Sequence, residues 1–193
     1  MIEMLIGIGG ATLSGKTTVS QRLNERLSDM GFSSVVIPEF AREVAKKMGY
    51  KKVDDIRRNP LDYFRFELEV LKMKVKMESD LIRSYDFVIC DSTVAEVYLY
   101  SKLYLPSNLS RKISGIVRRY IDRYDVVFLL QPLNVYVDDG FRSLRDIAER
   151  SKHYEILKKI YNNRFTELPA TTAEKRVERI LNEILSRKSN SSI

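Results

Sequence analysis

The stretch LIGIGGATLSGKTTVSQRL, residues 5–23, decides the fold. It begins as a short apolar run typical of a buried strand and ends with the mixed polar and apolar pattern of a helix. Glycines and small polar residues lie between these two parts. The central residues 10–17, GATLSGKT, match the pattern G-x-x-x-x-G-K-[ST] in full. Because a strand precedes this pattern and a helix follows it, the stretch predicts a phosphate-binding loop.

The residue types in this loop suit the binding of a triphosphate. Glycine has no Cβ atom, so successive backbone N–H groups can turn inward around an anion, and the helix N-terminus adds partial positive charge. We expect Lys16 to reach the β- and γ-phosphates and Thr17 to bind Mg²⁺ through its hydroxyl group. The predicted cofactors are therefore ATP and Mg²⁺. The predicted nucleotide-binding residues are Gly10, Ala11, Thr12, Leu13, Ser14, Gly15, Lys16, Thr17 and Thr18.

Strand and helix patterns alternate along the whole chain. We expect strands at residues 4–9, 33–37, 86–90, 125–130 and 164–168. We expect helices at residues 15–30, 40–49, 60–84, 94–104, 109–123, 152–162 and 172–187, with a frayed tail at 188–193. Short, continuously apolar strands are typical of a parallel sheet that is covered on both faces. The pattern predicts one domain over residues 1–193, with an α/β three-layer P-loop NTPase fold around a five-stranded parallel sheet.

The longest predicted helix, residues 60–84, carries apolar residues at helical spacing. A first stripe consists of Phe66, Val70, Met73, Met77 and Leu81. A second stripe consists of Phe64, Leu68, Leu71, Val75 and Ile82. The two stripes predict a helix that is covered on more than one side.

The composition narrows the classes of protein that the chain can represent. Its 193 residues are 44% hydrophobic and 31% charged, which favours a globular protein with a substantial core. The longest apolar runs are too short to cross a bilayer, and no targeting signal is evident at the N-terminus. A single cysteine, Cys90, fits a reducing compartment, and we expect a cytoplasmic protein.

The net charge of +7 attracts anions, including nucleotides and nucleic acids. Basic residues gather at 111–123, on the polar side of a predicted amphipathic helix. This pattern favours a solvated surface over a nucleic-acid patch, although a nucleic-acid partner stays possible. The sequence leaves the oligomeric state open.

Polar residues follow the predicted strands at the edge where parallel strands bind their ligands. We therefore expect the loop at 10–17, Glu39, Asp91 and the segment after Gln131 to converge. Asp91 can hold Mg²⁺ directly or through water, or it can cap the following helix, a role that Ser92 can also fill.

Glu39 ends the second predicted strand, and Arg42 follows about one helical turn later. Glu39 can accept a proton from a substrate hydroxyl or hydrogen-bond to it. Arg42 can hold a phosphate or the substrate. The residues alone leave open that Glu39 merely favours the next helix N-terminus and that Arg42 is simply solvated.

The segment after the fourth predicted strand is long and charged, with Gly140 near its centre. We expect residues 133–150 to form a lid over bound ATP. Arg142 or Arg145 would then neutralise charge on the transferred phosphoryl group. The alternative is an ordinary surface loop with paired charges.

Five segments together resemble the NadR-type ribosylnicotinamide kinase domain and the P-loop ATPases and kinases around it. They are GATLSGKT at 10–17, PEFARE at 38–43, VICDS at 88–92, YDVVFLL at 124–130 and DGFRSL at 139–144. The segments occur in the family's order and cover roughly residues 4–145. The resemblance implies a fold of the nucleoside or nucleotide kinase type, with an arginine-bearing lid and ATP as the phosphoryl donor.

The resemblance also implies that Glu39 and Arg42 line the acceptor site. The chain departs from the family pattern two positions after Asp91, where Thr93 replaces an acidic residue. The next carboxylate is Glu96, one helical turn later, and we include Glu96 among the predicted substrate contacts.

These observations predict an enzyme that transfers the γ-phosphoryl group of Mg-ATP to a hydroxyl of a small nucleoside-like molecule. The predicted catalytic residues are Lys16, Glu39, Asp91, Arg142 and Arg145. Thr17 and Asp91 are the predicted metal ligands. The alternative is an ATP-hydrolysing or ATP-sensing module that acts on a protein or RNA partner. The identity of the acceptor and the preference for ATP over GTP stay open.

Overall fold

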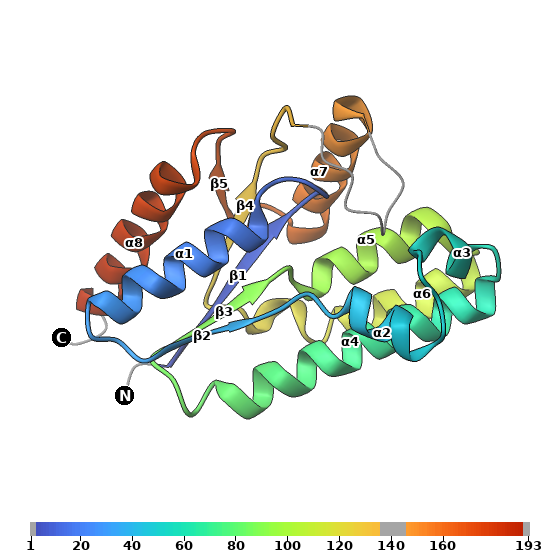
Figure 1. Ribbon diagram of the computed structural model, residues 1–193, viewed down its shortest axis with the longest axis horizontal. Helices are drawn as coiled ribbons and strands as arrows, with labels where there is room; N and C mark the ends of the chain where they lie inside the picture. The colour runs from blue at the N-terminus through green and yellow to red at the C-terminus, as the bar shows by residue number, and fades with distance from the viewer. Residues whose placement is uncertain (1–2, 136–145, 191–193) are drawn as a thin grey trace.

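A five-stranded sheet in the order β2-β3-β1-β4-β5 forms the centre of the computed structural model (Figure 1). The structure describes residues 3–135 and 146–190. The strands are β1 (Met4–Gly10), β2 (Ser34–Ile37), β3 (Phe87–Asp91), β4 (Val126–Leu130) and β5 (Thr166–Leu168). Each neighbouring pair is parallel. All strands therefore end at the same edge of the sheet.

Helices cover both faces of the sheet (Figure 1). On one face lie α1 (Lys16–Asp29) and α8 (Ala173–Asn190), which pack against each other. On the other face lie α4 (Pro60–Leu81), α5 (Val94–Tyr104), α6 (Ser107–Val117) and α7 (Ile147–Tyr161). Two short helices, α2 (Ala41–Lys47) and α3 (Val53–Arg57), contact α4. The predicted three-layer α/β fold with a parallel sheet is confirmed.

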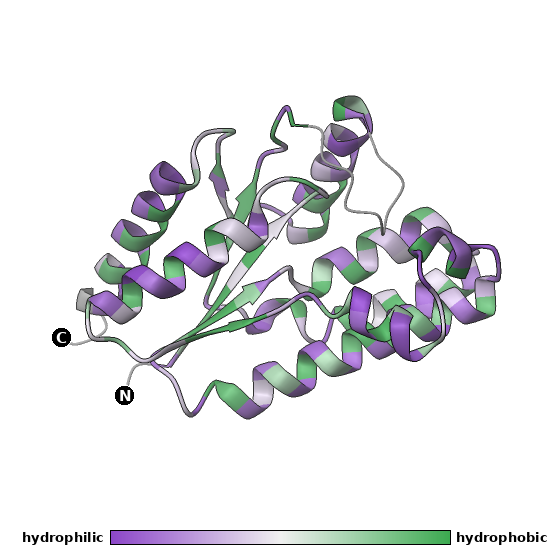
Figure 2. Ribbon diagram, viewed as in Figure 1, coloured by the Kyte–Doolittle hydropathy of each residue, from purple (hydrophilic) through white to green (hydrophobic). Residues whose placement is uncertain are grey.

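Alternating side chains of the strands divide the core between the two faces. Leu5 of β1 belongs to the cluster on the α4 and α5 side, whereas Ile6 and Ile8 belong to the cluster under α1 and α8. The central strands β3 and β4 are buried along their whole length and are mostly hydrophobic (Figure 2). This double burial explains why the strand sequences show no alternation of polar and apolar residues.

Several predicted boundaries are wrong. The helix expected at 109–123 begins at Ser107 and ends at Val117, and a separate 3₁₀ turn, η1, follows at Ile121–Arg123. Helix α7 begins earlier than expected because Asp146 caps it, its carboxylate accepting a hydrogen bond from Glu149 N at 2.7 Å. Helix α3 was not predicted, since a five-residue helix is too short to show a periodicity.

The predicted fraying at 188–193 is wrong for residues 188–190, which continue helix α8. The ammonium group of Lys188 lies 3.8 Å from the centre of the Phe32 ring. This cation–π contact, together with the helical hydrogen bonds, holds the end of α8 against the body of the protein. Residues 191–193 lie outside the described residues.

The buried face of α4 differs from the predicted apolar stripes. Met77 was predicted to be inside, but it is 37% exposed. The second half of the buried face instead carries two charged residues, Lys74 at 1% exposure and Glu78 at 0%. The apolar pattern therefore gave the correct helix and part of its inner face, since Phe66, Val70 and Leu71 are buried as expected.

No helix within residues 3–135 and 146–190 has the length and hydrophobicity that a membrane-spanning segment needs.

Gly7 marks the closest approach between β1 and the helix layer. A Cβ atom at this position would lie 2.9 Å from Thr93 Cγ2 and 3.2 Å from Tyr124 Cδ1. We expect Gly7→Ala to lower the free energy of unfolding by about 1–3 kcal/mol, because the added methyl group overpacks the core. Urea unfolding measures this change.

The matched control is Gly115→Ala, at an exposed position of α6 with nothing within 4 Å of the new Cβ. This variant should gain about 0.5–1 kcal/mol from the better helix propensity of alanine. Equal effects of the two substitutions would contradict the close approach at Gly7.

Candidate active site

A cleft lies at the edge where the parallel strands end. It is lined by residues 12–18 after β1, by Glu39 and Arg42 after β2, by Asp91 at the end of β3, and by Leu133 and Val135 after β4. Residues far apart in the sequence thus meet in one site, because the strands that carry them run in the same direction.

The loop between β1 and α1 has the backbone of an anion-binding turn. Gly10 has φ +154°, and a Cβ atom there would lie 2.5 Å from Ser14 Oγ, so this position requires glycine. Gly15 has φ +86° and caps α1 without a side-chain hydrogen bond. The first N–H groups of α1 therefore have no capping side chain and suit a bound phosphate.

Lys16 lies over the loop, where its ammonium group donates to Gly10 O at 2.8 Å and to Ala11 O at 3.0 Å. The two hydrogen bonds thus hold the positive charge of Lys16 beside the phosphate-binding loop. From this position, a swing of a flexible side chain would bring the ammonium group to a bound polyphosphate.

The hydroxyl of Thr17 donates to the carboxylate of Asp91 at 2.6 Å. Burial raises the pKa of Asp91, and the hydrogen bond from Thr17 opposes that rise. Hydroxyl and carboxylate oxygens are ligands that suit Mg²⁺. Among the residues that the structure describes, no group of three or more His, Cys, Asp or Glu side chains forms a metal site. Thr17 and Asp91 are thus residues that could hold Mg²⁺, and this role stays a prediction from the sequence.

Glu39 lies close enough to Asp91 for its charge to add to the rise in the pKa of that residue. It also belongs to a second, inner pocket beside the cleft, between α2, α3, α4 and α5. Aromatic residues Tyr63, Phe66 and Tyr100 line this inner pocket. Glu39 is thus common to the wall of the cleft and the wall of the inner pocket.

Glu96 also lines the inner pocket, but its carboxylate is engaged by the protein. One oxygen accepts a hydrogen bond from Gly10 N at 2.9 Å. The other accepts from Thr93 N at 2.9 Å and from Thr93 Oγ1 at 2.6 Å, which completes a capping box at the start of α5. Glu96, a predicted substrate residue, therefore also connects the phosphate loop to α5.

Most of the predicted lid lies outside the described residues. Arg142 and Arg145 lie outside the described residues, as does the whole of 136–145. The described start of the segment is held by Arg150, a buried residue of α7 that donates to Leu133 O at 2.8 Å and to Val135 O at 3.0 Å. Arg150 therefore shapes one wall of the cleft.

Arg176 of α8 is a site residue that the sequence analysis missed. Its guanidinium group is buried behind the loop and donates to Ser14 O at 2.5 Å, to Gln131 O at 2.8 Å and to Pro169 O at 2.8 Å. Burial lowers the pKa of this arginine. Arg176 joins the loop to the segments after β4 and β5, and no motif in the sequence marks it.

The fold and the loop define a P-loop nucleotide-binding protein. A family model described as "AAA domain" matches residues 5–176, and the chain belongs to this family. No curated protein matches the chain.

Solved structures confirm the fold. The NadR protein in complex with NR is 19% identical, with a TM-score of 0.69 over 94% of this chain and 51% of that chain. NadR with NAD and AMP-PNP is 16% identical, with a TM-score of 0.63 over 94% of this chain and 49% of that chain. A deoxyadenosine kinase from M. mycoides is 16% identical, with a TM-score of 0.60 over 95% of this chain and 99% of that chain. The chain thus spans about half the length of the NadR chains, and the predicted resemblance to NadR-type domains is confirmed.

We expect Arg176→Met to weaken the binding of Mg-ATP on the order of 10- to 100-fold, because the loop loses its anchor at Ser14 O. Isothermal titration calorimetry with a non-hydrolysable ATP analogue measures this affinity. Arg179→Met is the control, since Arg179 is exposed on the same helix. If the two variants bind the analogue equally well, Arg176 does not position the loop.

Proposed function

We propose that the chain is an ATP-dependent kinase that transfers the γ-phosphoryl group of Mg-ATP to a hydroxyl of a small nucleoside-like acceptor. One observation carries the proposal: Glu39 lies in the wall shared by the phosphate cleft and the inner pocket. The inner pocket has a volume of about 30 Å³, so it must open to admit an acceptor. A donor in the cleft and an acceptor in the opened pocket would then meet beside one carboxylate.

In this proposal, the N–H groups of the loop and Lys16 bind the triphosphate. Thr17 and Asp91 would hold Mg²⁺, which when bound neutralises charge on the phosphates. Arg42 lines the same cleft and supplies further positive charge. Most of the catalysis then comes from positioning and charge neutralisation.

Glu39 acts on the acceptor. Its carboxylate orients the acceptor hydroxyl and takes its proton as the new bond between that oxygen and the γ-phosphorus forms. The bond between the γ-phosphorus and the bridging oxygen breaks, and ADP leaves. The proton then passes from Glu39 to solvent. Arg142 and Arg145 stay predictions from the sequence for stabilising charge on the transferred group.

Two similar structures suggest which acceptors to test first. One is a NadR protein in complex with NR, and one is a deoxyadenosine kinase. Aromatic side chains in the inner pocket suit the flat ring of a nucleoside. A panel should therefore contain nicotinamide riboside, deoxyadenosine, adenosine and cytidine.

The test measures ADP release from Mg-ATP with and without each nucleoside, with mass spectrometry of the product. We expect one nucleoside to stimulate ADP release and to gain a phosphoryl group. Lys16→Ala should lower this rate about 10²–10³-fold, because the variant loses a cation beside the transferred phosphate.

Lys112→Ala, at an exposed position of α6, is the control for Lys16→Ala. Equal ADP release with every nucleoside, or none, would overturn the kinase and favour the ATP-hydrolysing or ATP-sensing alternative. Full activity of Lys16→Ala would exclude the proposed role of the loop.

Glu39→Gln separates the chemistry from nucleotide binding. We expect kcat to fall about 10²–10⁴-fold, because glutamine cannot accept the proton, while the affinity for Mg-ATP changes little. Glu43→Gln is the matched control, since Glu43 of α2 is exposed and pairs with Lys47. The role of Glu39 is wrong if both variants retain the wild-type kcat.

A further inference from the structure

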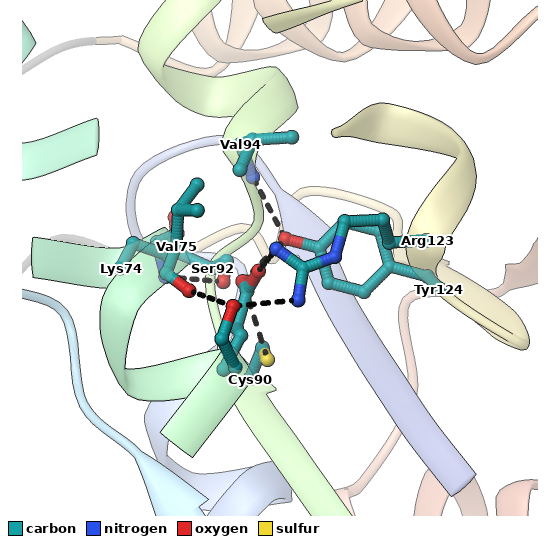
Figure 3. A network of polar contacts seen from close by, with 9 residues as sticks. Lys74, Val75, Cys90, Ser92, Val94, Arg123 and Tyr124 are labelled. Atoms are coloured by element: carbon teal, nitrogen blue, oxygen red, sulfur yellow. Dashed lines mark hydrogen bonds and ion pairs between the residues drawn. The ribbon is translucent and has the colours of Figure 1, made fainter. Parts of the chain in front are cut away.

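Lys74 is a buried cation at the inner pocket. It lies on the inner face of α4 and is 1% exposed. Its ammonium group donates to Ser92 O at 2.7 Å, as Figure 3 shows. Its neighbours Lys72 and Lys76 point to solvent, with side chains that are 71% and 78% exposed. Of these three lysines, only Lys74 lines the inner pocket, where a bound molecule can contact its ammonium group directly.

The ammonium group of Lys74 has hydrogen-bonding capacity left over. A lysine ammonium carries three N–H donors, and Ser92 O is the one hydrogen-bond acceptor that Lys74 has within residues 3–135 and 146–190. Buried charges normally have several partners, because leaving water is costly. A second oxygen is therefore expected from a molecule in the pocket.

The nearest buried acid on the same helix does not pair with Lys74. The carboxylate of Glu78 accepts from Tyr124 OH at 2.8 Å, and Arg123 Nη1 lies 3.8 Å from its other oxygen. Figure 3 shows Arg123 and Tyr124 gathered on one side of this network, and Lys74 turned to Ser92 on the other. The positive charge of Lys74 thus stays on the side of the pocket.

Ser92 supports this arrangement through its backbone. It has φ +76°, a left-handed conformation that is uncommon for serine, and its N–H donates to Ile8 O at 3.1 Å. Its carbonyl then accepts from Lys74, and both residues line the inner pocket together with Glu39. Strained residues of this kind cluster at ligand sites, where the surroundings hold them.

We propose that Lys74 determines acceptor specificity by donating a hydrogen bond from its ammonium group to an oxygen of the acceptor. The inference rests on the proposed kinase function and adds the chemistry of the acceptor. Besides the hydroxyl that is phosphorylated beside Glu39, the acceptor carries a carbonyl or hydroxyl oxygen that reaches Lys74. The pocket opens to admit this molecule, and its aromatic residues then pack against the flat ring to which the oxygen is attached.

The experiment uses Lys74→Met in the full chain, since methionine keeps the length of the side chain and removes the charge and the N–H donors. The acceptor is the nucleoside of the panel that the wild-type protein phosphorylates fastest. We expect the KM for this acceptor to rise at least about tenfold, while the KM for ATP stays within about threefold. Lys72→Met and Lys76→Met are the controls and should match the wild type.

Acceptor analogues that each lack one oxygen locate the contact. The wild type should lose affinity for the analogue that lacks the contacted oxygen, and Lys74→Met should not distinguish it from the parent compound. Thermal unfolding serves as the measure of folding. Lys74→Met should be about as stable as the wild type, because the lost hydrogen bond to Ser92 O is offset by the removal of a buried charge.

The inference is overturned if Lys74→Met leaves the acceptor KM unchanged, or if both KM values rise together with a loss of thermal stability. If Lys74→Met does not fold, Lys74→Gln, which keeps N–H donors without charge, replaces it. Failure of both variants to fold would assign Lys74 a structural role. If the wild type phosphorylates no nucleoside, the proposed function fails and this inference with it. An active wild type with an unchanged acceptor KM in Lys74→Met would instead overturn only the role of Lys74 and leave the proposed function standing.

Discussion

The hydrogen bond from Gly10 N to the carboxylate of Glu96 is the contact on which the site depends. It forms because β1 carries glycines where α5 approaches, so that a carboxylate on the helix can reach the strand backbone. The second oxygen of Glu96 caps α5 through Thr93. One buried carboxylate therefore fixes the entrance of the phosphate loop and the start of the helix that lines the inner pocket. A shift of α5 would therefore change both the phosphate loop and the inner pocket.

A buried charge of the opposite sign holds the other part of the loop. Arg176 donates to Ser14 O, whereas Glu96 accepts from Gly10 N, so the loop backbone is bound on both sides by charge-assisted hydrogen bonds. Such bonds offset part of the cost of burying a charged group. They leave the N–H groups after Gly15 for a ligand, because none of the anchors uses them. The loop is thus organised before the nucleotide arrives, and binding need not order it.

The sequence predicted those features that depend on local pattern. The phosphate loop is contiguous. Asp91 ends β3 and Glu39 lies two residues after β2, so the shared direction of the strands brings both residues to the cleft. Residues held by burial of charge were not predicted. Periodicity places lysine, arginine and glutamate on the outside of a helix, so Lys74, Arg176 and Glu78 were overlooked, and Met77 was placed inside instead. Which charges are buried depends on partners distant in the chain, such as Ser92 O and Ser14 O, and no single helix shows them.

The charged residues of the site form an ordered series. Lys16, Arg42 and Asp91 line the cleft, Glu39 lies in the wall shared with the inner pocket, and Lys74 lines the inner pocket. The order matches a transfer reaction, in which negative charge moves between donor and acceptor while both must be held. Cations on either side can each bind one reactant, and the carboxylates between them can hold a metal ion and receive a proton. In the proposed reaction the inner pocket has a role that a nucleotide-hydrolysing site does not need, since an attacking water molecule requires neither aromatic walls nor a buried lysine.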